Sequence, residues 1–173
     1  MIYWIFDMDD TLYQRNGKEF SYDMLKRDNE LIYLLKKLEG RKILLTNGTH
    51  QHTNIVLEKM DLTSVFDLIL DRNILGARKP NPDVYFKINK WCSLNTNDTC
   101  IYFEDILQNL IVATRAYGWI SVYINPDEQP ATNIPISFTI EIYDGKRKPS
   151  GAIINYSFKN IKSALRHFIN KTV

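Results

Sequence analysis

This 173-residue chain has few features that would substitute for a hydrophobic core, such as disulfide-forming cysteines, or that would interrupt one, such as low-complexity tracts. It has only two cysteines, Cys92 and Cys100, and their separation fits neither a metal-binding nor a redox motif. The simplest interpretation is a pair of reduced thiols in a cytoplasmic protein. The chain also lacks internal repeats and low-complexity tracts. Hydrophobic residues make up 45% of it, which excludes a disordered or fibrous protein.

An excess of charge is also missing, as are long apolar runs. The 22 basic and 20 acidic residues give a formal net charge of +2. This balance gives no overall electrostatic case for binding nucleic acid or a membrane surface. No uncharged apolar run is long enough to span a bilayer, and no signal-peptide pattern opens the chain. We therefore expect a cytoplasmic protein without a membrane partner, folded as a single domain over residues 1–173.

Short apolar runs alternate with amphipathic stretches along most of the chain. The apolar runs predict buried strands at residues 2–6, 42–46, 66–71, 100–105 and 119–125. The amphipathic stretches predict helices at residues 22–38, 50–60, 78–92 after a proline-rich turn, 107–118 and 158–169. Such alternation is typical of an α/β fold with a Rossmann-like, doubly wound and mostly parallel sheet. Functional sites of these folds lie at the carboxyl ends of the strands.

Two hairpins are expected outside this alternation. Asn16-Gly17 favours a type I′ turn, which predicts a small hairpin soon after the first strand. Near the C-terminus, residues 136–143 and 151–158 flank a segment with Gly145 and Pro149, which predicts an extra antiparallel hairpin. We hypothesise that this second hairpin forms a homo-oligomer contact or a partial lid.

Polar residues that could take part in catalysis or metal binding follow four of the predicted strands. In chain order they are Asp7 and Asp9, then Thr46-Asn47-Gly48, then Lys79, then Glu104 and Asp105. The carboxyl ends of parallel strands meet at one edge of a sheet, so these groups are expected to share a cleft. Crowded carboxylates are stable there when they hold a hard cation such as Mg²⁺. A nearby lysine adds compensating charge.

These four segments resemble, in order and spacing, the motifs of the haloacid dehalogenase-like phosphatases. The stretch DMDDT at residues 7–11 fits the DxDxT motif, and Thr46 fits the second motif. Lys79 in RKPNPDVY fits the third, and FEDILQN at residues 103–109 fits the fourth. The resemblance covers roughly residues 2–125. The stretch LLTNGTHQHTNIVLEKMDLTSVFDLI is most similar to the pyrimidine 5′-nucleotidase-like branch, which has a histidine at the place of His52.

The resemblance implies a Mg²⁺-dependent phosphomonoesterase that acts on nucleotides or other small phosphate esters. Asp7 would be the nucleophile, and Asp9 the general acid and then the base. The Thr46 hydroxyl and the Asn47 backbone N–H would hold phosphoryl oxygens, and Lys79 would neutralise charge. The dehalogenases of the superfamily lack an acid at the place of Asp9, so this residue favours phosphate ester hydrolysis.

The resemblance also implies a ligand set for the metal. Mg²⁺ would take a carboxylate oxygen of Asp7, the backbone carbonyl of Asp9 and the carboxylate of Asp105. Glu104 and Asn109 would ligate it directly or through water. The neighbouring Asp10 is assigned no catalytic role. His50 and His52 are expected to be ordinary polar residues at the start of a helix, pointing apart and holding no metal.

Many members of this family insert a helical cap between the first and second motifs. Here residues 12–41 have room only for the small hairpin and one helix, so the chain resembles a capless member. That hairpin would be the local gate, with Arg15 and Lys18 as candidate substrate contacts. Two alternatives stay open at this point: a capless phosphatase of phosphoproteins or polynucleotide ends, and a non-catalytic binding or scaffold protein.

Overall fold

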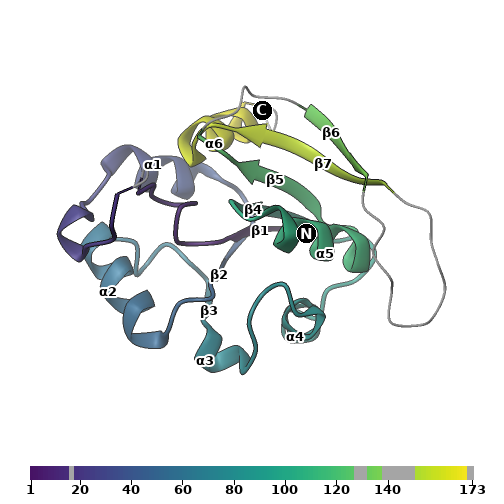
Figure 1. Cartoon of the computed structure of the whole chain (residues 1–173), viewed down its shortest axis with the longest axis horizontal. Helices are drawn as coiled ribbons and strands as arrows, with labels where there is room; N and C mark the ends of the chain where they lie inside the picture. The colour runs from purple at the N-terminus through teal and green to yellow at the C-terminus, as the bar shows by residue number, and fades with distance from the viewer. Residues whose placement is uncertain (16–17, 127–131, 138–150, 171–173) are drawn as a thin grey trace.

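A seven-stranded sheet forms the centre of the computed structural model, which describes residues 1–15, 18–126, 132–137 and 151–170 (Figure 1). The spatial order of the strands is β3-β2-β1-β4-β5-β7-β6. All neighbouring pairs are parallel except β6 and β7, so the predicted mostly parallel sheet is confirmed. The strands are β1 (Ile2–Phe6), β2 (Arg41–Leu45), β3 (Leu68–Leu70), β4 (Thr99–Glu104), β5 (Ile120–Ile124), β6 (Thr132–Ser137) and β7 (Gly151–Phe158).

Helices cover both faces of the sheet, which confirms the doubly wound arrangement (Figure 1). One core includes buried side chains of α1, α2 and α6, and the other includes side chains of α3, α4 and α5. The helical segments are η1 (Tyr22–Met24), α1 (Asn29–Lys37), α2 (His50–Met60), α3 (Arg72–Leu75), α4 (Pro82–Trp91), α5 (Leu107–Tyr117) and α6 (Ile161–Ile169).

Strand β1 explains how one short apolar run serves both cores. Successive side chains of a strand point to opposite faces. Trp4 and Phe6 therefore enter the core beside α1 and α6, while Tyr3 and Ile5 enter the core beside α4 and α5. A strand buried on both faces has no polar alternation, which is why residues 2–6 read as continuously apolar.

The predicted helix over residues 22–38 is wrong in its middle. The structure has the single turn η1 and then α1, with Leu25 extended between them. Asp28 is also extended, and its side chain accepts a hydrogen bond from the Leu31 N–H at 3.0 Å. This cap fixes the start of α1 at Asn29. The short helix α3, which Asp71 caps, was not predicted from the sequence.

The C-terminal hairpin extends the main sheet. Strand β7 pairs antiparallel with β6 and parallel with β5, so the hairpin is the edge of the sheet. The sequence predicts the first strand of this hairpin at residues 136–143, but β6 begins four residues earlier, at Thr132. The remainder of that predicted strand lies outside the described residues, as does the Asn16-Gly17 turn. The last helix begins at Ile161 because Phe158 belongs to β7 and Asn160 caps α6.

The segments that could hold a cap domain are short. In the described part of the chain, only η1 and α1 lie between β1 and β2, and only α2, β3 and α3 lie between β2 and Lys79. The edge of the sheet that carries the four motifs is thus built without an inserted domain. Among the described residues, no helix is long and apolar enough to cross a membrane.

Candidate active site

The carboxyl ends of three adjacent strands bring the predicted site residues together. Asp7 follows β1, Thr46 follows β2, and Glu104 ends β4. The parallel ladder continues just past β1, because the Asp7 N–H donates to the Phe103 carbonyl at 2.9 Å. The Thr46 N–H likewise donates to the Leu70 carbonyl of β3 at 3.0 Å. Strand pairing therefore fixes the backbone of these positions.

A buried ion cluster joins the first, third and fourth motifs. The Lys79 Nζ lies 2.6 Å from Asp7 Oδ1, 2.7 Å from Glu104 Oε2 and 2.9 Å from the Leu45 carbonyl oxygen. All three donors of the ammonium are thus used. The side chains of Lys79 and Glu104 are each 1% exposed, and that of Asp7 is 8% exposed. Because no water solvates charges buried this deeply, each is stable only beside an opposite charge.

The same burial perturbs the proton affinities of the cluster. Burial and the nearby Glu104 charge raise the pKa of Asp7, and the Lys79 ammonium only partly opposes them. Burial also acts to raise the pKa of Glu104, but Lys79 and its hydrogen-bond donors outweigh it and leave that pKa lowered. Burial alone would lower the pKa of Lys79, yet the two carboxylates raise it. One ammonium therefore compensates incompletely for two carboxylates.

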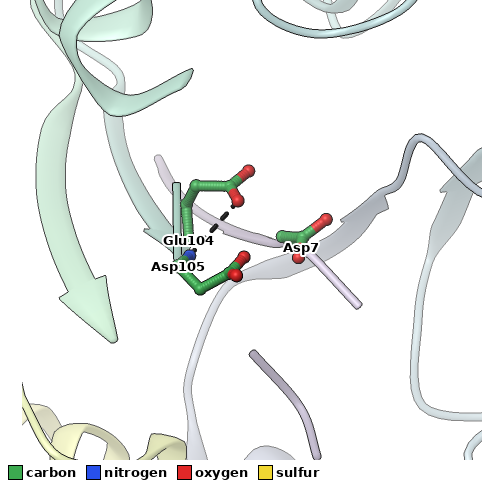
Figure 2. A group of neighbouring side chains, drawn as sticks. All are labelled: Asp7, Glu104 and Asp105. Atoms are coloured by element: carbon green, nitrogen blue, oxygen red, sulfur yellow. Dashed lines mark hydrogen bonds between the residues drawn. The ribbon is translucent and has the colours of Figure 1, made fainter. Parts of the chain in front are cut away.

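Asp105 adds a third acid to this group. Carboxylate oxygens of Asp7, Glu104 and Asp105 lie within 4.8 Å of one another, and Figure 2 shows Glu104 and the following Asp105 extending to the side on which Asp7 lies. Burial, together with the neighbouring Glu104 and Asp7, raises the pKa of Asp105 to about 9. The Thr11 hydroxyl lies between two of the acids, 3.1 Å from Asp7 Oδ2 and 3.5 Å from Asp105 Oδ1. Carboxylates crowded in this way fit a divalent cation with oxygen ligands.

The hydrogen bonds of Glu104 distinguish it from the other two acids. Its Oε2 accepts from Lys79 and from the Tyr102 hydroxyl, while Oε1 accepts from the backbone N–H groups of Asp105 and Ile106 at 3.2 and 3.1 Å. Each oxygen of Glu104 therefore accepts two hydrogen bonds, whereas each oxygen of Asp7 accepts one from a described side chain, Lys79 or Thr11. Asp7 and Asp105 are the better placed direct ligands, and the buried Asn109 lies in the first turn of α5.

The candidate general acid Asp9 is held by a histidine. Its side chain is 33% exposed, and its Oδ1 lies 2.8 Å from His52 Nε2 and accepts a hydrogen bond from the Tyr13 hydroxyl. The expectation that His52 is an ordinary helix-start residue is therefore wrong. His50 does point elsewhere, with its Nδ1 2.7 Å from Asp71 Oδ2. The motif likeness singled out a histidine at position 52, but 43 positions separate it from Asp9, so the sequence did not indicate this contact.

Residues of the second motif make hydrogen bonds to the Thr46 hydroxyl and to the backbone of the loop that carries Lys79. The buried Thr46 hydroxyl accepts from the Gly48 N–H at 2.9 Å. The Asn47 side chain contacts both backbone groups of Lys79: its Oδ1 accepts from the N–H at 2.8 Å, and its Nδ2 donates to the carbonyl at 3.1 Å. Asn47 thus positions the backbone of Lys79, whereas a role for its own N–H in substrate binding stays a prediction.

A cavity of about 380 Å³ lies beside Asp105, and Arg15 and Lys18 line it. The guanidinium of Arg15 is paired with Asp10, whose carboxylate also accepts from the Arg15 backbone N–H at 3.1 Å. Asp10 adopts a left-handed conformation with φ of 58°, which aspartate tolerates better than most residues. Asp10, which was assigned no catalytic role, therefore anchors the candidate substrate contact Arg15.

Known proteins share this architecture. The chain is similar over 97% of its length, and 98% of the other chain, to a HAD phosphatase from Thermococcus onnurineus, with a TM-score of 0.62 and 15% identity. The magnesium-bound putative HAD-hydrolase YfnB from Bacillus subtilis has a TM-score of 0.58 at 17% identity, over 83% of this chain and 56% of that one.

Haloacid dehalogenases share part of the fold. The L-2-haloacid dehalogenase from Xanthobacter autotrophicus matches 62% of this chain with a TM-score of 0.51 and 17% identity. This chain spans only 44% of that dehalogenase. Residues 13–118 match the family of haloacid dehalogenase-like hydrolases. Since that match covers more than half of the chain, the protein belongs to the haloacid dehalogenase-like hydrolase family.

Proposed function

We propose that this protein is a Mg²⁺-dependent phosphomonoesterase that works through an aspartyl-phosphate on Asp7. The observation that carries this proposal is the placement of Asp9. Its carboxyl lies two residues beyond the buried Asp7, is one-third exposed and is held by Tyr13 and His52. Loss of halide needs no proton, whereas an alcohol leaving group does. A positioned acid therefore favours phosphate ester hydrolysis over dehalogenation.

The reaction would proceed in two displacements. An Asp7 carboxylate oxygen attacks phosphorus, the bond from phosphorus to the ester oxygen breaks, and Asp9 donates its proton to the departing alcohol. Asp9 then takes a proton from water, whose oxygen bonds to phosphorus while the bond to Asp7 breaks. Lys79 Nζ, 2.6 Å from Asp7, offsets negative charge during both transfers. The Thr46 hydroxyl would hold a phosphoryl oxygen.

The metal site in this proposal consists of Asp7, Asp105 and the Asp9 carbonyl. When bound, Mg²⁺ would supply positive charge to the phosphoryl oxygens and to the crowded carboxylates. Glu104 would act mainly by fixing Lys79, because each of its oxygens already accepts two hydrogen bonds. Asn109 would contribute through water.

The substrate class in the proposal is nucleotides or other small phosphate esters, as the motif likeness to the pyrimidine 5′-nucleotidase-like branch implies. One observation favours a second candidate, a phosphatase of phosphoproteins or polynucleotide ends. In the described part of the chain, no inserted domain lies between β1 and β2, and basic residues Arg15 and Lys18 line the adjacent cavity. An uncovered site accommodates a large phosphorylated substrate.

A panel of phosphate esters, assayed with Mg²⁺ and with EDTA, tests the proposal. The panel includes UMP, CMP, phosphopeptides and 3′-phosphorylated oligonucleotides, which separates the two candidate classes. We expect Mg²⁺-dependent release of phosphate that Asp7→Asn abolishes while the far-UV circular dichroism is unchanged. The control Asp23→Asn alters a side chain that is 96% exposed and should leave turnover intact. Retained turnover in Asp7→Asn would contradict the mechanism, and inactivity of the wild type on the whole panel would favour a binding protein.

A further inference from the structure

The carboxylate of Asp9 is held at only one of its two oxygens. Both the Tyr13 hydroxyl and His52 Nε2 contact Oδ1, the latter at 2.8 Å. No hydrogen bond from the described residues reaches Oδ2. A proton on this carboxyl therefore belongs on Oδ2, because Oδ1 already accepts two hydrogen bonds. The arrangement leaves the proton-bearing oxygen available to a leaving group.

The imidazole of His52 is itself fixed in one orientation. Its Nδ1 lies 2.9 Å from the Tyr22 hydroxyl. A neutral ring with its proton on Nε2 satisfies every contact, since Tyr22 then donates to Nδ1 and Nε2 donates to Asp9. The ring of Phe20 packs edge-on against it, with centroids 5.3 Å apart and planes at 72°. The rings of Phe20 and Tyr22 thus limit the rotation of the imidazole.

The backbone beneath His52 is equally constrained. The His52 N–H donates to the side chain of Thr49, the N-cap of α2, at 3.1 Å. A Cβ at Gly48 would lie 3.0 Å from His52 Cδ2, so a larger residue there would displace the ring by a few tenths of an ångström. His52 thereby connects the loop that carries Thr46 with the loop that carries Asp9. This connection is not explained by packing alone, because the His52 side chain is 20% exposed.

We propose that His52, together with Tyr13, is a positioning residue that orients the Asp9 carboxyl so that Oδ2 presents its proton to the leaving-group oxygen. This inference rests on the proposed phosphatase function. It assigns to the α2 histidine a task in proton transfer during ester cleavage, without contact to substrate. Its effect should therefore depend on how much the leaving group needs protonation.

A pair of substrates that differ in the leaving group tests the proposal. Phenyl phosphate has a poor leaving group, whereas 2,4-dinitrophenyl phosphate releases a stable anion without a proton. We expect His52→Leu to lower kcat/KM for phenyl phosphate by about 10- to 100-fold, and for the activated ester by less than about 3-fold. His52→Gln keeps a side-chain N–H at a similar reach and should recover part of the loss.

Two further variants separate positioning from a general loss of structure. Tyr13→Phe removes the second donor to Oδ1, keeps the ring beside Phe20, and should show the same selective loss. The matched control is His50→Leu, two residues away on α2, whose imidazole contacts Asp71. This control should leave the ratio of the two kcat/KM values unchanged.

The outcomes distinguish this inference from the function on which it rests. If the wild type hydrolyses both esters, and His52→Leu and Tyr13→Phe lower both kcat/KM values by the same factor, the positioning role is overturned while the phosphatase function stands. Unchanged kcat/KM for phenyl phosphate in either variant also overturns it. A wild type that hydrolyses neither ester, with Mg²⁺ present, overturns the proposed function and this inference with it.

Discussion

Among the individual residues of the site, Lys79 is the one that balances two buried negative charges. It is the counter-charge, in the described part of the structure, for both Asp7 and Glu104, and its side chain is 1% exposed. We predict that Lys79→Met lowers the free energy of unfolding by about 3–5 kcal/mol, because it leaves two buried carboxylates without a cation. Urea denaturation at neutral pH in EDTA measures this change.

A second substitution isolates the charge from the lost packing. Glu104→Gln added to Lys79→Met removes one of the two uncompensated charges, so the double variant should be more stable than Lys79→Met alone. Lys90→Met, on the exposed side of α4, is the control and should change stability by less than about 0.5 kcal/mol. A Lys79→Met protein as stable as the wild type would show that the cluster is neutral in the folded state.

Asp10 gives a pH-dependent prediction at the same scale. Hydrogen bonds from Arg15 hold the pKa of Asp10 below its ordinary value. The stabilisation is therefore present above the pKa of the unfolded chain and is lost as the pH falls through the folded pKa. We expect Asp10→Asn to lower the free energy of unfolding by less than about 1 kcal/mol at pH 7, since the pair is partly exposed.

The pH profile of the Asp10 variant provides its check. The difference between wild type and Asp10→Asn should shrink as the pH is lowered below about 4, where the unfolded carboxyl takes up its proton. Asparagine tolerates the left-handed backbone at this position, so the comparison isolates the charge. A difference that stays constant between pH 7 and pH 3 in urea titrations would mean that the ion pair is not its cause.

At the scale of elements, the start of α1 shows what periodicity cannot reveal. Apolar residues between positions 22 and 38 recur at helical spacing, so a single helix was predicted. The break at residues 25–28 arises because Asp28 serves two partners outside that pattern. It caps α1 at the Leu31 N–H and accepts from Lys162 of α6 at 2.8 Å. A tertiary ion pair of this range is invisible in a local window.

The two tasks of Asp28 can be separated by substitution. Asp28→Ala removes both the cap and the ion pair and should lower the free energy of unfolding by about 1–2 kcal/mol. Asp28→Ser keeps a capping oxygen, so it should cost less than about 1 kcal/mol, similar to Lys162→Met. Chemical denaturation of the three variants gives the order. If Asp28→Ser is as damaging as Asp28→Ala, the link between α1 and α6 outweighs the cap.

At the scale of the whole molecule, the alternation of strands and helices was predictable, because a parallel sheet buried on both faces leaves continuous apolar runs such as residues 2–6. The strand at the edge of the sheet, β6, was less predictable. β6 begins at Thr132, within a stretch of prolines and polar residues that reads as a loop. Its strand conformation comes from pairing with β7, which in turn pairs with β5. Local composition does not encode such pairing.

Some residues of the candidate site were also predictable from the sequence, and others were not. Asp7 and Asp105 were brought together by topology, because residues that follow parallel strands converge at one edge. Asn47 holds the backbone of Lys79 beside them. The contact of His52 with Asp9 depends on side-chain direction in the first turn of α2, and the anchoring of Arg15 by Asp10 depends on a left-handed residue. Neither is set by strand order. Positions predicted from motifs were thus found together, while the residues that orient them needed coordinates.

The crowding of acids makes the response of the whole fold to Mg²⁺ predictable. Asp105 lies near two other carboxylates, so without a cation its charge opposes folding. We expect Asp105→Asn to melt at a higher temperature than the wild type in EDTA. Mg²⁺ should raise the melting temperature of the wild type, by the equivalent of about 2.7 kcal/mol at about 100 times Kd, but not that of Asp105→Asn. The order of the two proteins should therefore reverse or close on adding Mg²⁺, while Asp23→Asn follows the wild type in calorimetry. An equal response of Asp105→Asn to Mg²⁺ would place the cation elsewhere.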